Sequence, residues 1–452
     1  MNEAAAAHTM TARDESRGAL RRPLSDRLMQ EQTFYSATLA NGLRVLTASL
    51  PHTRSVSVSI YIGAGSRYER PFEAGLSHFV EHLCFKGTER RPSPREISQI
   101  VDSVGGILNA GTDRELTVYY GKVARPHLEL VVDVLADMLR FSLFAPEEME
   151  KERRVILEEL AMVSDSPSQL VDVLIDELLW PGQPLGWDVA GSRETVSAIT
   201  RDMALDYLHR QYVPNNMVVS VAGNVSEDEV LDLIGRTMGD WQPGAPSGWF
   251  PALKRQGQPG VAVTQKKTEQ AHLTLAVYGL PIEHPDRYVL DLLSVVLGEC
   301  MSSRLFLELR ERMGICYDVH SYVDHFLDAG SLGVYAAVDP GNAAKALKAL
   351  ATEVGRLRDG VQEDELRKAK ELSKGRLLLR MEDTRSVSGW IGAQELLLDK
   401  VRTVDEVVGA MEAVTAEELR RVANELLVED GLKLAVVGPF RSERRFLPLL
   451  KL

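Results

Sequence analysis

Hydrophobic and polar positions follow two different periods along the chain, and their order predicts a mixture of strands and helices. From residue 55, SVSVSIYIGAG alternates with period two, which predicts a strand with one buried face. Just before it, TFYSATLANGLRVLTASL contains an Asn-Gly pair between apolar segments, which indicates a hairpin turn. PREISQIVDSVG has helical spacing up to Gly105 and Gly106. A strand pair is expected over 107–123, and LELVVDVLADMLRFSLF predicts an amphipathic helix.

The same order of elements returns in the second half of the chain. VAVTQKKTEQAHLTLAVYGLP takes the place of LRVLTASLPHTRSVSVSIYIGAG, and both halves end in a helix, a short strand and a glycine. A proline- and glycine-rich stretch separates the halves. We therefore expect an α+β fold with a flexible N-terminal extension (1–32), a first domain (33–241), a linker (242–260) and a second, similar domain (261–452).

Composition narrows the class of protein. The chain has 452 residues, of which 44% are hydrophobic and 26% charged, as in soluble globular proteins of two domains. Its net charge of -13 argues against a nucleic-acid-binding surface. No apolar run is long enough to span a membrane, and the N-terminal segment has no apolar core of a secretory signal.

Cysteine usage indicates where the protein works. Cys84, Cys300 and Cys316 form no CxxC pair, which fits a reducing compartment. We expect the cytoplasm. The mitochondrial matrix is the alternative, because RGALRRPLSDR weakly suggests a transit peptide, although nearby acidic residues count against it.

LSHFVEHLCFKGT, residues 76–88, is the strongest chemical signal in the chain. On a helix, His78, Glu81 and His82 fall on one face within a turn, so two imidazoles could share one metal ion. By spacing alone, packed or surface histidines remain the alternative. Cys84 points away from this face and is expected to be a buried thiol.

A catalytic zinc ion needs a third protein ligand. The candidate segment is EEMEKERRVILEEL, residues 147–160, in which Glu152 and Glu159 lie two helical turns apart on one face. A solvated helix face with ion pairs explains this pattern equally well.

Together these motifs resemble the M16 family of zinc peptidases, which includes pitrilysin and the mitochondrial processing peptidase. The resemblance runs from about residue 35 to 440, through GSRYE, LNAGTDRELTVYY and PLGWDVAGSRETVSAIT. It implies two M16-type α/β-sandwich domains, with mostly antiparallel sheets, that form a clamshell. It also implies one Zn²⁺ per chain held by His78, His82 and Glu159, with Glu81 as general base and Glu152 orienting a ligand.

The resemblance assigns further residues to the substrate. Arg310 and Tyr317, in MSSRLFLELRERMGICYDVHSY, match an Arg and a Tyr that the family sends from its second domain toward the zinc. The segment that the family uses to pair with an extended peptide corresponds here to Leu108, Asn109, Ala110, Gly111 and Thr112.

Three functions remain open at this point. The first is a self-sufficient zinc endopeptidase that acts on peptides, expected to be a homodimer. The second is a subunit of a heterodimer with a related chain, similar to the β subunit of the processing peptidase. The third is a non-catalytic scaffold. The complete ligand set favours the first.

Overall fold

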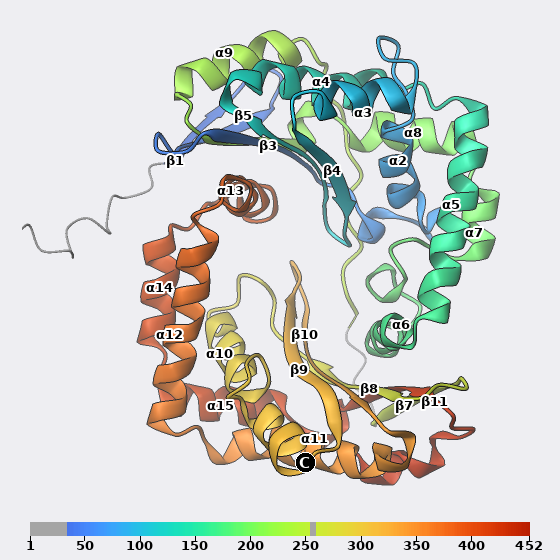
Figure 1. Ribbon diagram of the computed structural model, residues 1–452, viewed down its shortest axis with the longest axis vertical. Helices are drawn as coiled ribbons and strands as arrows, with labels where there is room; N and C mark the ends of the chain where they lie inside the picture. Colours follow the sequence, from blue (N-terminus) through green and yellow to red (C-terminus); the bar gives the residue numbers. More distant parts are fainter. Residues whose placement is uncertain (1–33, 254–258) are drawn as a thin grey trace, which may run out of the picture.

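The computed structural model describes residues 34–253 and 259–452, which build two β-sheets with helices on their outer faces (Figure 1). The first sheet has the strand order β1-β2-β6-β3-β5-β4. Its strands are β1 (Phe34–Thr38), β2 (Arg44–Ser49), β3 (Ser55–Ile62), β4 (Ile107–Thr112), β5 (Thr117–Ala124) and β6 (Met217–Gly223). The predicted hairpin at the Asn-Gly pair joins β1 and β2, and the predicted strand pair over 107–123 is β4 and β5.

The second sheet repeats the topology of the first, in the order β7-β11-β8-β10-β9. Its strands are β7 (Gly260–Gln265), β8 (Ala271–Tyr278), β9 (Cys316–His325), β10 (Gly330–Val338) and β11 (Lys433–Gly438). In each sheet the last strand of its half inserts between two earlier strands, parallel to one and antiparallel to the other. The expected α+β fold and the repeated order of elements are therefore confirmed.

The predicted domain limits fall partly outside the structure. The extension 1–32 lies outside the described residues, as does part of the linker. The described linker residues up to 253 form no helix or strand, and β7 already begins at Gly260.

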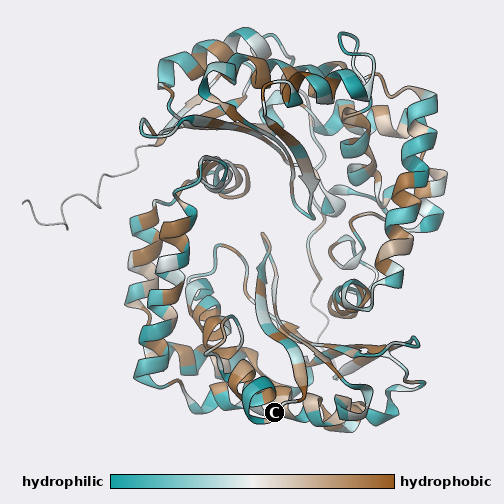
Figure 2. Cartoon of the chain, viewed as in Figure 1, coloured by the Kyte–Doolittle hydropathy of each residue, from teal (hydrophilic) through white to brown (hydrophobic). Residues whose placement is uncertain are grey.

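Helices pack against both sheets and enclose their main cores. Those of the first half are α2 (Leu76–Cys84), α3 (Pro94–Asp102), α4 (Leu128–Phe141), α5 (Pro146–Asp165), α6 (Pro167–Leu179), α7 (Arg193–Ala198), α8 (Arg201–Gln211) and α9 (Glu227–Met238). Those of the second half are α10 (Arg287–Leu297), α11 (Ala343–Arg356), α12 (Glu363–Arg380), α13 (Thr384–Leu398), α14 (Val404–Ala413) and α15 (Ala416–Leu426). Figure 2 shows hydrophobic residues concentrated in the strands and on the helix sides that face them. Within the described ranges, no helix has the length and apolar character needed to cross a bilayer.

The two halves exchange one helix each. α6 belongs to the first half but packs on β7, β8 and β11 of the second sheet, whereas α13 of the second half packs on β2, β3 and β6 of the first. Each exchange builds its own apolar cluster. Val171 and Ile175 of α6 pack with Ala435 and Val437 of β11. The burial of apolar surface at these two contacts holds the halves together.

β3 is buried on both faces, so the prediction of one buried face was wrong. The serines of its polar face contact α13: Ser57 Oγ lies 2.9 Å from Thr384 Oγ1, and Ser59 Oγ lies 2.6 Å from Ser388 Oγ. These hydroxyls are satisfied by a helix more than 300 residues later in the chain, which allows them to be buried without losing hydrogen bonds.

Candidate metal centre and active site

Helix α2 carries both histidines and is anchored at its first turn by a buried carboxylate. Gly75, with φ 91°, precedes the helix. Its N–H and that of Ser77 donate to Glu69 at 2.9 Å and 2.6 Å. Negative charge is favourable at a helix N-terminus, while complete burial raises the pKa of Glu69 to about 7. Phe79 and Leu83 bury the opposite side of the helix in the core, so the histidine side faces α5.

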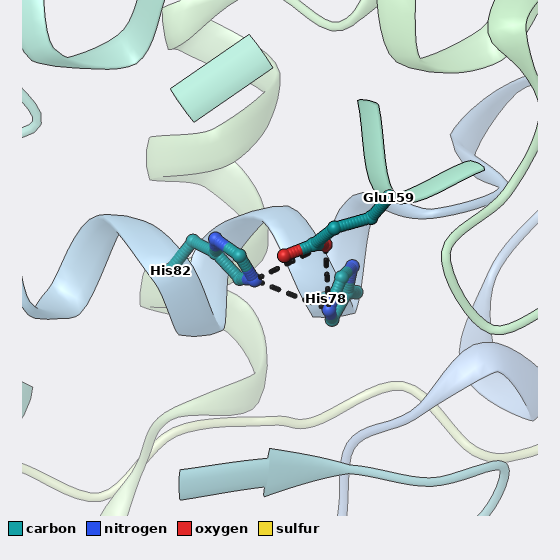
Figure 3. Close-up of side chains that lie close together, drawn as sticks. All are labelled: His78, His82 and Glu159. Carbon is teal, nitrogen blue, oxygen red and sulfur yellow. Dashed lines mark hydrogen bonds and ion pairs between the residues drawn. The ribbon is translucent and has the colours of Figure 1, made fainter. Parts of the chain in front are cut away.

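Three side chains that could together hold a metal ion converge between α2 and α5 (Figure 3). His78 Nε2 and His82 Nε2 lie 3.2 Å apart. Glu159 Oε2 lies 3.9 Å from His78 Nε2 and 3.8 Å from His82 Nε2. Each residue offers one ligand atom, and these atoms all lie within 4.8 Å of one another. Within the described residues this is the single group of three or more such side chains.

The donor set fits a zinc ion. Ligands about 2.0–2.1 Å from a tetrahedral zinc lie about 3.3 Å from each other. The two histidine nitrogens match this spacing at 3.2 Å, and the Glu159 oxygen lies about half an ångström farther from each of them. Burial, together with the neighbouring His82, lowers the pKa of His78 to about 4, so its imidazole is neutral, the form that binds metal. Two nitrogens facing each other at 3.2 Å with a carboxylate beside them form a typical cation site.

Glu152 orients one of the two rings from behind. Its Oε2 lies 3.0 Å from His82 Nδ1, and its Oε1 forms an ion pair with Lys86 Nζ at 2.8 Å. Burial opposes ionisation of Glu152, but the contacts with His82 and Lys86 outweigh it and lower its pKa. For His82, burial is likewise outweighed by the bond to Glu152 and by nearby carboxylates, which raise its pKa. An ionised Glu152 favours the tautomer of His82 with its proton on Nδ1 and a free lone pair on Nε2.

Glu81 lies beside the metal-binding group and is almost fully buried. Thr112 Oγ1 donates to Glu81 Oε2 at 2.6 Å. Burial raises the pKa of Glu81, and the hydrogen bond from Thr112 and the proximity of His82 oppose that rise.

The predicted substrate strand is the edge strand β4. It pairs with β5, and its other side has no strand partner among the residues that the structure describes. Leu108 and Ala110 pack against the core, while Asn109 is exposed. A Cβ atom at Gly111 would meet nothing within 4 Å, so a glycine is not required there by packing.

Arg310 and Tyr317 lie together in the second half. Arg310 is in a π-helical segment (Phe306–Arg312), and Tyr317 begins β9. The guanidinium of Arg310 lies 5.1 Å from the centre of the Tyr317 ring and donates to the Tyr317 carbonyl at 3.0 Å. Tyr317 is 75% exposed. No hydrogen bond, ion pair or ring contact within the described ranges joins this pair to the metal-binding residues, so their predicted approach to the substrate stays a prediction.

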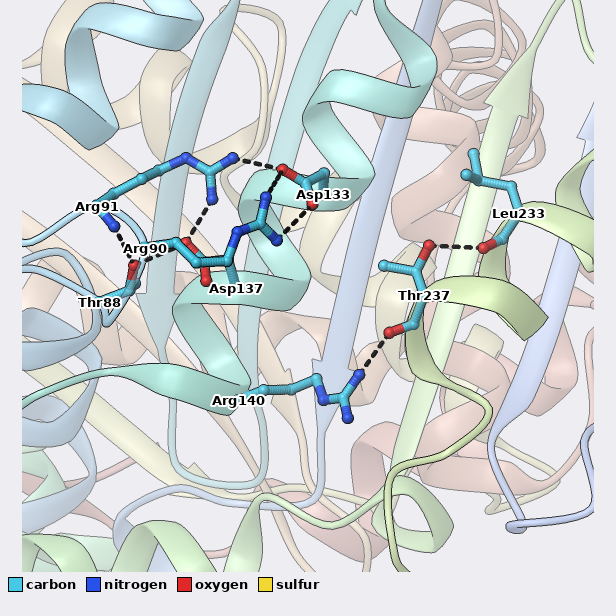
Figure 4. Close-up of polar contacts among 8 residues, drawn as sticks. All are labelled: Thr88, Arg90, Arg91, Asp133, Asp137, Arg140, Leu233 and Thr237. Carbon is cyan, nitrogen blue, oxygen red and sulfur yellow. Dashed lines mark hydrogen bonds and ion pairs between the residues drawn. The ribbon is translucent and has the colours of Figure 1, made fainter.

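The loop after α2 is fastened to α4 by a cluster of charges (Figure 4). Asp137, which is buried, accepts hydrogen bonds from Thr88 Oγ1 at 2.7 Å and from Arg91. Arg90 binds both oxygens of Asp133 at 2.8 Å. These contacts hold the segment that leads out of the histidine helix against α4.

Cys84, His272 and His284 are not part of the group that could hold a metal ion. Cys84 is completely buried, and burial raises the pKa of its thiol to about 12, as expected for a packed cysteine. His272 Nδ1 lies 2.7 Å from the Tyr335 hydroxyl. His284 lies in the loop before α10.

Sequence reasoning missed two residues that support the site, Glu69 and Lys86, and the contact from Thr112 to Glu81. The strand pattern could have predicted the contact from Thr112 to Glu81. Side chains alternate along a strand, so Thr112 belongs to the same face of β4 as Leu108 and Ala110, the face turned to the helices.

Comparison with known proteins identifies the family. Residues 44–193 match the model described as Insulinase (Peptidase family M16), and residues 198–373 match the model of the Peptidase M16 inactive domain. An uncharacterized zinc protease of Bacillus subtilis is 38% identical, covering 89% of this chain and 97% of the relative. An uncharacterized zinc protease of Mycobacterium leprae is also 38% identical, covering 90% of this chain and 92% of the relative.

Solved structures share the fold. A protease from Helicobacter pylori superposes with a TM-score of 0.86 at 24% identity, covering 90% of this chain and all of the other. A chain of complex III2 from Candida albicans superposes with a TM-score of 0.79 at 19% identity, covering 92% of this chain and all of the other. Family models, relatives and fold agree: the chain belongs to the M16 family of zinc peptidases.

Proposed function

We propose that the protein is a zinc-dependent endopeptidase that cuts extended peptides. The observation that carries the proposal is the convergence of His78, His82 and Glu159, with the carboxylate of Glu81 beside them. These three side chains would hold the ion. Zinc bound there would supply a Lewis acid for the peptide carbonyl and lower the pKa of a bound water.

Glu81 is the proposed general base. It would accept a proton from the attacking water and return it to the departing amine. Burial, which raises its pKa, suits this role, because a base works best when its pKa lies near the working pH.

The free edge of β4 is the proposed binding place for the peptide. A strand edge offers a row of backbone N–H and C=O groups, which pair with an extended backbone whatever its side chains. This mode selects unfolded segments, including presequence-like ones, over folded proteins.

Tyr317 and Arg310 are proposed to act from the second half once substrate is bound. The Tyr317 hydroxyl would donate to the oxyanion of the tetrahedral intermediate, and Arg310 would position the peptide backbone. The high exposure of Tyr317 supports this role, because its hydroxyl is available to a ligand.

We further propose a self-sufficient homodimer in the cytoplasm. The chain contains both the metal-binding set and the Arg310–Tyr317 pair, so no second chain is needed to complete the site. Its three free cysteines fit a reducing compartment.

The proposal is tested by purifying the chain alone and mapping cleavage of an unstructured peptide library, with and without a chelator. The wild type is expected to cleave and to carry one zinc per chain, and Glu81→Gln to keep the zinc and lose cleavage. Normal turnover by Glu81→Gln would exclude Glu81 as the base. Activity that appears only with an added related chain would favour the heterodimer.

A further inference from the structure

We propose that Thr112 is a positioning residue that fixes the carboxylate of Glu81 and thereby links the edge strand β4 to the general base. This inference rests on the proposed function, because it assigns Thr112 a task only if Glu81 acts on the substrate.

The contact between the two side chains is short and has a defined direction. Thr112 Oγ1 lies 2.6 Å from Glu81 Oε2, and since an ionised carboxylate has no proton to give, the hydroxyl is the donor. Hydrogen bonds to a charged acceptor are about twice as strong as neutral ones. Among the described residues, Thr112 Oγ1 is the only side-chain donor to the Glu81 carboxylate, and the backbone of Thr112 contributes a second hydrogen bond to it.

The alternation of side chains along β4 places Thr112 on the face of the strand that is turned toward α2. Leu108 and Ala110, four and two positions earlier, pack against the core between sheet and helices. Side chains alternate along a strand, so Thr112 belongs to the same face, which is turned toward α2. Its backbone remains on the strand edge, where a peptide would pair. One residue therefore contributes to the peptide-binding edge and to the orientation of the base.

The hydroxyl of Thr112 is not committed elsewhere. The neighbouring Thr117 Oγ1 lies 3.5 Å away but donates to the Ala64 carbonyl at 3.0 Å. The single hydroxyl proton of Thr112 is therefore donated to Glu81. Without the hydroxyl, only the backbone of Thr112 would still hold the carboxylate, whose orientation for proton transfer would then be less closely fixed. A peptide paired with β4 would hold the strand, and through Thr112 also the base.

The matched variants are Thr112→Val, which keeps the shape and removes the hydroxyl, Thr112→Ser, which restores it, and Thr117→Val as a control. Thr117 is a buried threonine that does not touch Glu81. Each is measured for kcat and KM on one fluorogenic peptide, zinc content and melting temperature. If Thr112→Val does not fold, Thr112→Ala replaces it.

We expect Thr112→Val to lower kcat about 10- to 100-fold, with KM and zinc content little changed. Thr112→Ser should recover most of the wild-type kcat, and Thr117→Val should keep it. Unchanged kcat in Thr112→Val, or equal losses in Thr112→Val and Thr112→Ser, would overturn the inference while leaving the proposed function intact. A zinc-loaded wild type that cleaves no peptide would instead remove the proposed function, and this inference with it.

Discussion

His82 Nδ1 and Glu152 Oε2 lie 3.0 Å apart, and this contact connects α5 to the metal-binding nitrogen through the ring of the histidine. Removing such an orienting carboxylate typically costs about 10- to 100-fold in metal affinity. We therefore expect Glu152→Ala to weaken zinc binding by that factor in competition with a chromophoric chelator, and Glu152→Gln to weaken it less.

Glu150→Ala is the control for this prediction. Glu150 lies on the same helix but faces solvent, where it pairs with Arg153. Equal zinc affinity in Glu152→Ala and Glu150→Ala would show that Glu152 does not support the site.

Tyr317→Phe tests the contribution of the second half to catalysis. Loss of one hydrogen-bond donor to an oxyanion typically costs about 100-fold or more in kcat. We expect such a loss with little change in KM. The ring is 75% exposed, so the melting temperature should not change. An unchanged kcat would make this tyrosine structural.

The strands of the first sheet, several helices of the first half and the repeated order of elements followed from period and turn residues, which are local properties of the chain. The burial of Ser57 and Ser59 did not follow. Alternation in SVSVSIYI indicates which side chains share a face, but not what covers each face. Here the cover is Thr384 and Ser388 of α13, and no local pattern connects segments so far apart.

Gly392 of α13 tests this long-range contact. A Cβ atom there would lie 2.6 Å from Ser220 Oγ and from the ring of Tyr61, closer than side chains tolerate. We expect Gly392→Ala to lower the free energy of unfolding, by about 1–3 kcal/mol as in other overpacked cores.

Gly375→Ala is the matched control. Gly375 lies within α12, where a Cβ would meet nothing within 4 Å. There the better helix propensity of alanine should stabilise the protein by up to about 1 kcal/mol. If the free energy of unfolding, measured with urea, increased equally in both variants, the close approach of α13 to the first sheet would be contradicted.

His325 predicts a specific pH dependence of stability. Its Nδ1 lies 2.6 Å from the Leu280 carbonyl and its Nε2 lies 3.1 Å from Asp291 Oδ1. Both partners are acceptors, so both nitrogens must carry protons. Burial lowers the pKa of His325, but the bond to Asp291 and the other nearby acceptors outweigh burial and raise it.

A raised pKa in the folded state stabilises the protein fully below the unfolded value, about 6.5, and this contribution is lost as pH rises through the folded pKa. We expect the difference in unfolding free energy between wild type and His325→Gln to shrink as the pH rises from about 6.5 through the folded pKa of His325. The exposed His52 provides the control substitution. A difference independent of pH would show that His325 is not protonated in the fold.

The candidate site was predicted unevenly. Helical spacing placed His78, Glu81 and His82 on one face, but it left a solvated ion-pair face open for Glu152 and Glu159, and only the family resemblance selected these acids. Lys86 was missed because it reaches Glu152 only after α2 has ended, where helical periodicity no longer applies.

The most direct test of the account is a crystal of the zinc-loaded protein measured on both sides of the zinc absorption edge. We predict one anomalous peak per chain, about 2.0–2.1 Å from His78 Nε2, His82 Nε2 and an oxygen of Glu159. A fully loaded protein whose peak lies on other residues, or no peak between α2 and α5, would contradict it.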